Sequence, residues 1–184
     1  MDRWGNAVAN TTTINLTFGS GVVVTGAGFL LNDEMDDFSA KPGVPNFFGA
    51  VGGEANAIEP YKRMLSSMTP TLVTKDDQVV LVTGSPGGTT IISSVTQSLL
   101  NALLYDISAE EAVNSPRFHH QLLPKDTIRM HDGFTEATVN ELKAMGYTID
   151  NRRFGDVHLI KRTKEGVEAA SEKSGRGKSL VQPY

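Results

Sequence analysis

Apolar residues recur at three- and four-residue spacing in two parts of the chain, which is the pattern of an amphipathic helix. The first part, 91–104, begins directly after a Gly-rich turn and predicts a helix buried in the core. The second, Thr135–Met145, is followed by Gly146, a residue that commonly ends helices. A capping box at 108–111 opens a third, short helix that ends before Pro116. The apolar positions of the first helix are Ile91, Ile92, Val95, Leu99, Leu100, Leu103 and Leu104.

Runs rich in β-branched residues predict strands on both sides of these helices. Turn sequences precede or join the strands at 5–6, 75–77 and 164–166. Strands, then helices, then strands indicate an α+β fold, with helices packed on a mainly antiparallel sheet. The predicted strands are Ala7–Phe18, Met68–Val73, Gln78–Thr83, Tyr147–Ile149, Val157–Lys161 and Val167–Ala170.

Asn32–Gly53 carries Asp, Asn, Pro and Gly with little periodicity and is interpreted as a long loop. Long loops inside compact domains are uncommon and are usually functional. The chain has 184 residues, which predicts one domain over 1–184 with a sizeable core.

The amino-acid composition excludes several classes of function. The net charge is −4, from 17 basic and 21 acidic residues, so there is no electrostatic reason to expect nucleic acid as a partner. The absence of cysteine excludes disulfides and thiolate metal sites. No apolar run reaches the roughly 20 residues of a membrane span.

The stretch Gly84-Ser85-Pro86-Gly87-Gly88 lies between an apolar strand and the first helix. Backbone N–H groups at a helix start are free to bind negative charge, and the helix dipole reinforces this. The charge could belong to a bound anion or to an oxyanion formed during acyl transfer. A Walker loop and a dinucleotide fingerprint are both excluded by the spacing.

Two further groups of polar residues can carry chemistry. Glu34, Asp36 and Asp37 repel one another, so they form either a solvated acidic loop or a pocket for an ammonium group. Ser66 and Ser67 are either ordinary loop serines or two hydroxyl donors for a carboxylate.

The histidines point to structure rather than to chemistry. His119 and His120 are adjacent, so on an extended chain they face opposite sides, and such a pair rarely shares a metal. No His or Cys lies at ligand spacing with the acidic loop. By spacing alone, the chain offers an acidic cluster, a hydroxyl pair and an N–H pair, which together match a zwitterionic amino acid with an acyl carbon. No Gly-x-Ser-x-Gly elbow supplies an attacking group.

Four blocks of this sequence resemble the γ-glutamyltransferase family, and together they cover nearly the whole chain. The family consists of N-terminal-nucleophile hydrolases, in which a precursor cleaves itself into a large and a small subunit. The resemblance is to the small subunit and implies part of a four-layer αββα sandwich. The blocks are Asn32–Asn46, Leu65–Pro70, Gly84–Gly88 and Ala112–Gln121.

The resemblance implies a role for each candidate residue. Thr13 would hydrogen-bond the nucleophilic threonine, and Asn15, Glu34 and Asp37 would hold the α-ammonium group of the γ-glutamyl substrate. Ser66 and Ser67 would bind its α-carboxylate. The N–H groups of Gly87 and Gly88 would form the oxyanion hole.

The implied activity is transfer of a γ-glutamyl group from glutathione to water, an amino acid or a peptide, with no metal or organic cofactor. The implied partners are the large subunit, glutathione and other γ-glutamyl compounds, and amino-acid or peptide acceptors. The family setting implies a periplasmic or extracellular location.

The small subunit of the family opens with Thr-Thr-His-Tyr/Phe-Ser-Val, directly before the aspartate that aligns with Asp2. Its first threonine is the nucleophile, so the resemblance implies that this sequence lacks it. Thr11, Thr12 and Thr13 cannot replace it because they have no free α-amino group to act as base. We therefore expect a chain truncated at its N-terminus and inactive alone. A non-catalytic γ-glutamyl-binding or vestigial module is the alternative.

Overall fold

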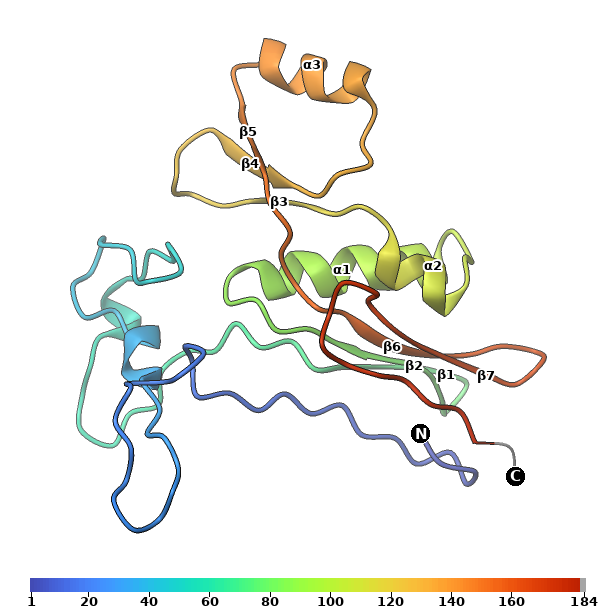
Figure 1. Ribbon diagram of the computed structural model, residues 1–184, viewed down its shortest axis with the longest axis horizontal. Coiled ribbons are helices and arrows are strands. Elements are labelled where there is room, and N and C mark those ends of the chain that lie inside the picture. Colours follow the sequence, from blue (N-terminus) through green and yellow to red (C-terminus); the bar gives the residue numbers. More distant parts are fainter. Residues whose placement is uncertain (183–184) are drawn as a thin grey trace. The chain divides into compact units, whose positions relative to one another are not determined.

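The computed structural model describes residues 1–182 and shows the expected α+β class (Figure 1). Two short 3₁₀ helices come first, and strands and α-helices follow. No helix in the described part of the chain is long and apolar enough to cross a bilayer. The elements are η1 Glu34–Asp37, η2 Glu54–Asn56, β1 Thr71–Lys75, β2 Gln78–Gly84, α1 Thr90–Leu103, α2 Ala109–Asn114, β3 Phe118–His120, β4 Thr127–Met130, α3 Glu136–Ala144, β5 Thr148–Asn151, β6 His158–Arg162 and β7 Val167–Ser171.

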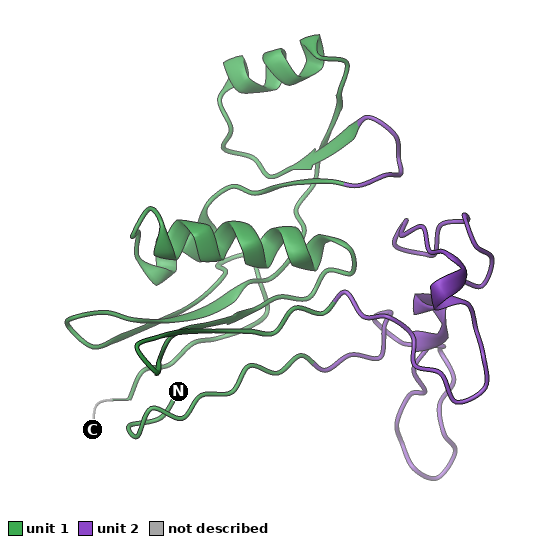
Figure 2. Cartoon of the chain, turned by 180° about the vertical axis from the view of Figure 1, so that it is seen from behind, with its two compact units in different colours: residues 1–11, 68–120, 127–184 green, residues 12–67, 121–126 purple. Residues whose placement is uncertain are grey.

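The chain divides into two compact units, which Figure 2 distinguishes by colour. Unit 2 consists of Thr12–Ser67 and Gln121–Asp126, and it holds the long loop and both 3₁₀ helices. Unit 1 consists of the remainder and holds every strand and α-helix. The single domain expected for 1–184 stays a prediction.

Unit 1 contains a four-stranded antiparallel sheet in the order β1-β2-β6-β7. The predicted hairpin is confirmed, and its turn residues Asp76 and Asp77 have φ angles of 51° and 59°. Two consecutive positive φ angles are typical of the type I′ turn, whose twist matches that of the strands. The predicted strands at 157–161 and 167–170 are also confirmed as β6 and β7.

A second, three-stranded sheet in the order β3-β4-β5 includes one parallel pair, β4 with β5. The strand expected at 147–149 is confirmed as β5, but β3 and β4 were not predicted. β3 is three residues long and contains two histidines, and β4, Thr-Ile-Arg-Met, alternates polar and apolar residues over only four positions. Strands this short give little signal in the sequence. The helix predicted to end at Gly146 is confirmed as α3, which packs against β5.

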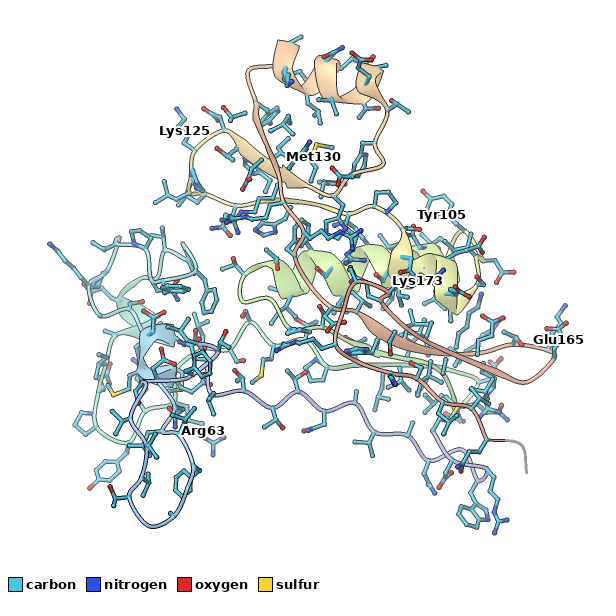
Figure 3. All side chains as sticks on the ribbon, viewed as in Figure 1. Arg63, Tyr105, Lys125, Met130, Glu165 and Lys173 are labelled. Carbon is cyan, nitrogen blue, oxygen red and sulfur yellow. The ribbon has the colours of Figure 1, made fainter. Side chains whose placement is uncertain are left out.

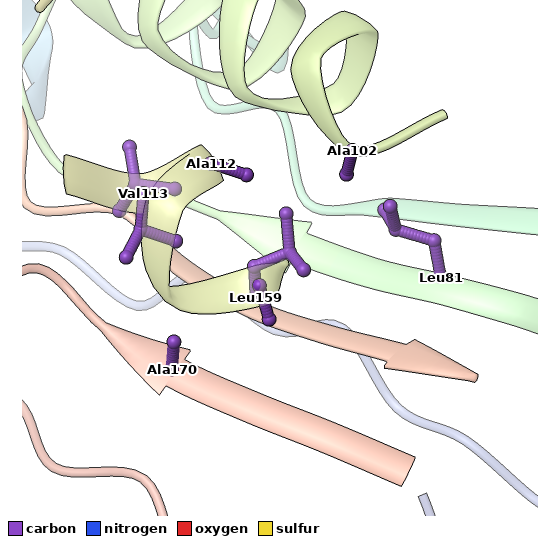
Figure 4. Packing of buried hydrophobic residues seen from close by; sticks show 8 residues of the cluster. Leu81, Ala102, Ala112, Val113, Leu159 and Ala170 are labelled. Atoms are coloured by element: carbon purple, nitrogen blue, oxygen red, sulfur yellow. The ribbon is translucent and has the colours of Figure 1, made fainter. Parts of the chain in front are cut away.

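The core of unit 1 lies between the four-stranded sheet and helices α1 and α2 (Figure 4). Leu81 and Leu159 of the sheet meet Ala102 of α1 and Ala112 and Val113 of α2. Small side chains at these contacts allow the helices to lie close to the sheet. The capping box predicted for α2 is confirmed: the Ser108 hydroxyl accepts from the N–H of Glu111, whose carboxylate accepts from the Ser108 N–H.

Helix α1 forms where the apolar spacing predicts it, but its buried face differs from the expected one. The buried stripe consists mainly of small residues, Thr90, Ser94, Ser98 and Ala102, together with Ile91 and Val95. The apolar positions extend around more than one face of the helix, so several remain on the side away from the sheet. The exposed apolar side chains at this helix and its end are Ile92, Leu100, Leu103, Leu104 and Tyr105, the last of which is labelled in Figure 3.

The long strand predicted over Ala7–Phe18 is wrong, because no strand is formed there within the described residues. The chain is extended only in its first part and then turns at Thr13–Asn15. Asn15 has a φ of 71°, and its N–H donates to the Thr13 hydroxyl at 2.7 Å. A left-handed residue cannot continue a strand. In 19–31 the structure forms turns with one isolated bridge between Val23 and Leu30.

A buried ion pair joins the end of α2 to the end of the four-stranded sheet. Arg117 Nη2 lies 2.6 Å from Glu172 Oε2, and both side chains are almost fully buried. Arg117 also donates to the carbonyl of Val113 at 2.7 Å, and the same Glu172 oxygen accepts from the N–H of Val157 at 3.1 Å. Each charge is therefore both paired and hydrogen-bonded, which a buried charge requires.

Removing one partner of this pair should destabilise unit 1 strongly. Arg117→Ala leaves the Glu172 carboxylate buried without its counter-charge, so we expect a loss of about 3–5 kcal/mol in the free energy of unfolding. Urea denaturation followed by circular dichroism measures the change. The exposed pair of Lys173 and Glu110, also 2.7 Å apart, is the control, and Lys173→Ala should cause a much smaller loss, because an exposed ion pair contributes little to stability. Equal losses in the two variants would contradict the prediction.

Candidate functional site

The Gly87-Gly88 turn connects β2, which ends at Gly84, to α1, which begins at Thr90. The carbonyl of Gly87 accepts from the Thr90 N–H at 3.1 Å, and the carbonyl of Gly88 accepts from the Ile91 N–H at 3.1 Å. These carbonyls take part in the first helical turn. Within residues 1–182 the Gly87 N–H has no hydrogen-bond partner. The sequence prediction of a strand, a Gly-rich turn and a helix is therefore confirmed.

Both glycines of the turn have a backbone conformation that favours glycine, with φ angles of 140° and 56°. A Cβ atom on Gly87 would lie 2.5 Å from Thr90 Oγ1. On another side, the same Cβ would meet Gly155 at 3.6 Å. Gly155 is equally restricted, because its own Cβ would lie 2.8 Å from the Ser94 hydroxyl oxygen. The side chains of Thr90 and Ser94 thus leave no room for a Cβ atom at Gly87 or at Gly155.

The segment behind the turn is held by hydrogen bonds and by the buried ion pair. The Ser85 hydroxyl oxygen accepts from the Asp156 N–H at 3.0 Å. Arg117 Nη2 lies 3.4 Å from the carbonyl oxygen of Phe154. Sequence reasoning missed Arg117, Phe154 and Gly155 as supports of the turn, because their contacts join parts of the chain that are far apart in sequence.

In unit 2, the turn at Thr13–Asn15 lies against the start of the acidic loop. The Asn15 side-chain amide donates to the carbonyl of Asp33 at 3.2 Å, and the Leu16 N–H donates to the Asp33 carboxylate at 3.1 Å. The Thr13 side chain and the Asn15 backbone lie close enough to the Glu34 carboxylate to lower its pKa, although burial raises that pKa more. The structure therefore brings Thr13, Asn15 and Glu34 together.

Glu34 and Asp37 are the first and last residues of η1, and the pKa of each carboxyl is raised. Burial raises the pKa of the Glu34 carboxyl, and the negative charge of Asp37 raises it further. Burial also raises the pKa of Asp37, with Asp36 as the next cause. Glu34 Oε1 is buried and has no hydrogen-bond partner among the described residues. Close, partly desolvated carboxylates are unfavourable unless a cation joins them. This arrangement favours the ammonium pocket over the solvated acidic loop.

Ser66 and Ser67 lie in the same unit as the acidic residues. The exposed Leu65 before them is anchored, because its N–H donates to the side-chain carbonyl of Asn56 at 3.0 Å. Asn56 also contacts η1, and sequence reasoning missed it, because an asparagine in a loop gives no distinctive signal. Of the proposed site residues, unit 2 holds Thr13, Asn15, Glu34, Asp37, Ser66 and Ser67, and unit 1 holds Gly87 and Gly88.

The other polar candidates have structural contacts. His119 is buried, and its Nδ1 lies 2.7 Å from the Ser93 hydroxyl oxygen, whereas its neighbour His120 is exposed, as the opposite-face prediction requires. His131 Nε2 lies 3.1 Å from the carbonyl oxygen of Phe154. Burial, reinforced by the charge of Arg117, lowers the pKa of His131. Residues 1–182 contain no group of three His, Cys, Asp or Glu side chains that could hold a metal ion.

Comparison with known proteins places this chain in a family. The family model described as Gamma-glutamyltranspeptidase matches residues 1–182. The chain is 55% identical over 186 residues to the glutathione hydrolase proenzyme of Pseudomonas aeruginosa, covering 98% of this chain and 33% of that relative. It is 42% identical over 183 residues to Scoloptoxin SSD20 of Scolopendra dehaani, covering 98% of this chain and 92% of that relative.

A solved structure shows the same fold. The γ-glutamyltranspeptidase of Pseudomonas nitroreducens, complexed with L-DON, superposes with a TM-score of 0.94 at 54% identity, covering 99% of this chain and 96% of that chain. The fold is thus that of an N-terminal-nucleophile hydrolase. The chain belongs to the γ-glutamyltranspeptidase family. It spans about a third or less of the first curated relatives that it matches.

The raised pKa values predict how the stability of unit 2 depends on pH. The folded unit holds the protons of Glu34 and Asp37 more tightly than the unfolded chain does. The resulting stabilisation is fully present below the ordinary carboxyl pKa and is lost as the pH rises through the raised values. Glu34→Gln removes one charge, so this variant should melt at a higher temperature than the unmodified chain at pH 7.

The difference in melting temperature between Glu34→Gln and the unmodified chain should disappear towards about pH 4, where the Glu34 carboxyl also becomes protonated. Calorimetric melting at a series of pH values measures it. Glu54→Gln, at an exposed position of the same unit, is the control and should change little. A Glu34→Gln variant that is less stable than the unmodified chain at pH 7 would contradict the prediction.

The packing of the Gly87-Gly88 turn gives a second prediction. Gly87→Ala places a Cβ against Thr90 Oγ1 in a strained backbone conformation. We expect the free energy of unfolding to fall by about 1–3 kcal/mol because of backbone strain and by a similar amount because of overpacking. Gly166 has nearly the same φ, 141°, but open space where a Cβ would stand, so Gly166→Ala should show the strain alone. Urea denaturation compares the two, and an equal loss would show that the contact with Thr90 has no effect.

Proposed function

We propose that this chain supplies the γ-glutamyl-binding groups and the oxyanion hole of an enzyme that cleaves the γ-glutamyl bond of glutathione. The enzyme would transfer the γ-glutamyl group to water, an amino acid or a peptide. The observation that carries the proposal is the cluster of Thr13, Asn15, Glu34 and Asp37 in one compact unit, with two carboxylates at raised pKa. Such a cluster is stabilised by a ligand cation, and a γ-glutamyl substrate carries one as its α-ammonium group.

Each group has a distinct role in this proposal. Glu34, Asp37 and the Asn15 side chain hold the α-ammonium group, and the hydroxyls of Ser66 and Ser67 donate to the α-carboxylate. The N–H groups of Gly87 and Gly88 donate to the oxyanion that forms when the γ-carbonyl is attacked. Donors fixed in advance at this position typically contribute about 10²–10³-fold in rate each. Thr13 would hydrogen-bond the nucleophile.

In this proposal the nucleophile is not one of residues 1–184. The proposed attacking group is an N-terminal threonine, whose own α-amino group serves as the base. The proposed partner is therefore the large subunit of the same precursor, together with the threonine that precedes the matched region. The glutathione hydrolase proenzyme of Pseudomonas aeruginosa is named as a proenzyme, which fits an enzyme made by cleavage of a longer chain.

A second candidate is a non-catalytic module that binds γ-glutamyl compounds. It is favoured by Scoloptoxin SSD20, a relative of nearly the same length as this chain. A module of this kind would still use the residues that bind the ammonium and carboxylate groups of the ligand. The Gly87-Gly88 turn, however, would have no reacting carbonyl to stabilise. Measurements of ligand binding and of substrate turnover distinguish the two candidate functions.

We expect residues 1–184 alone to bind L-glutamate without turning over γ-glutamyl-p-nitroanilide. Removing the nucleophile of a serine protease leaves only about 10³–10⁴-fold catalysis over water, so p-nitroaniline release should be undetectable. Calorimetric titration measures binding, and Asp37→Asn should weaken it at least about 10-fold, because a charged hydrogen bond is lost. Release of p-nitroaniline by the pure chain would contradict the absence of a nucleophile. Failure to bind glutamate would contradict the assignment of the pocket.

A further inference from the structure

We propose that Asn56 is a positioning residue that sets the separation between the ammonium-binding and carboxylate-binding groups of the site. This inference rests on the proposed function, because it takes Asp37 and the Ser66–Ser67 pair as the two ends of an amino-acid site. Asn56 itself would not touch the substrate. It would act through the backbone of the two segments that do.

The contacts of Asn56 connect those two segments directly. Its side-chain Nδ2 donates to the carbonyl oxygen of Asp37 at 2.7 Å, and its Oδ1 accepts from the N–H of Leu65 at 3.0 Å. Asp37 is the last residue of η1, and Leu65 immediately precedes Ser66. One planar amide group therefore links the acidic turn to the start of the serine pair.

Asn56 is itself held in place by its own backbone. It is the last residue of η2 and is half-buried. Its N–H donates to the carbonyl of Gly53 at 3.1 Å, and its carbonyl accepts from the N–H of Ser39 at 2.9 Å. Because Ser39 follows closely after the end of η1, Asn56 contacts the acidic turn through both its backbone and its side chain. These bonds hold the Asn56 side chain at a defined position next to the acidic turn.

The chemistry of an amide suits this position better than other side chains of its size. The contact needs a donor for the Asp37 carbonyl and an acceptor for the Leu65 N–H, and asparagine offers both on one short side chain. An aspartate would lose the donor and add a negative charge beside Asp36 and Asp37. A neutral bridge avoids raising the electrostatic cost of the acidic turn.

Spacing matters because an α-amino acid carries its ammonium and carboxylate groups on the same carbon. A site gains affinity from binding both groups at once only when the residues that bind them are held at the matching separation. Without the Asn56 side chain, each set of residues can still bind its own group of the ligand. The two sets can no longer bind both groups at the same time equally well. The loss should therefore appear for ligands that carry both groups and not for ligands that carry one.

The test titrates residues 1–184, observed by NMR, with three ligands. L-Glutamate carries both groups, glutarate lacks the ammonium group, and 4-aminobutyrate lacks the α-carboxylate. Asn56→Ala should weaken glutamate binding about 10-fold, the equivalent of one or two hydrogen bonds, and should change the dissociation constants of the other two ligands less than about 2-fold. Hydrogen exchange of the Leu65 and Ser66 amides should become faster in this variant without ligand.

Two further variants make the result specific. Asn114 has the same type of contacts in unit 1, since its amide donates to the Glu110 carbonyl at 2.8 Å and accepts from the Lys173 N–H at 2.9 Å. Asn114→Ala is the matched control and should leave glutamate binding unchanged. Asn56→Gln keeps the donor and the acceptor but moves them by one methylene group, so it should fold and still bind glutamate more weakly. It decides the question if Asn56→Ala does not fold.

Each other outcome has a defined meaning. Equal weakening of all three ligands would indicate a general loss of structure and would overturn the inference. Unchanged glutamate binding in Asn56→Ala, or in a folded Asn56→Gln variant, would overturn it as well. If the unmodified chain does not bind glutamate, the proposed function fails and the role of Asn56 fails with it. The first two results leave the proposed function intact, so the two failures are distinguishable.

Discussion

The order of unit 1 depends on one buried ion pair, Arg117 with Glu172. It joins a residue beyond α2 to the residue after β7, and both side chains also bind the segment that leads into β6. That segment contains Gly155, which lies against Gly87. A pair of charges buried away from water is stable only while both are present and hydrogen-bonded. The geometry of the Gly87-Gly88 turn therefore depends on a long-range contact that no local signal near Gly87 reveals.

Unit 2 is organised around a different constraint, which is the repulsion between carboxylates on a short turn. Thr13 and Asn15 lower the pKa of Glu34, but by less than burial and the charge of Asp37 raise it. The unit thus retains an unfavourable charge arrangement within its own fold. Residues that are costly to stability are common where a ligand compensates for the cost. Here the proposed compensating ligand is an ammonium group, which agrees with a family that acts on γ-glutamyl compounds.

Much of the fold follows from local sequence, and the failures have identifiable causes. Helices α1, α2 and α3 and the hairpin of β1 and β2 formed where spacing, caps and turn residues predicted them. The strand expected at 7–18 did not form, because β propensity measures how well a residue fits a pleated surface, and Thr13 and Asn15 instead turn the chain. Strands β3 and β4 were missed because they are only three and four residues long, too short for a distinctive pattern.

By itself, the sequence determined the candidate groups: the acidic loop, the serine pair and the Gly-Gly turn, each from residue type and local order. These depend on neighbours within a few positions, so they can be read before folding. Only the tertiary structure decided which face of α1 is buried, that Arg117 pairs with Glu172, and that Asn56 links Asp37 to Leu65. Such contacts join residues that are distant along the chain. These contacts stabilise the protein only after the backbone has brought both partners together. Patterns of neighbouring residues in the sequence therefore do not reveal them.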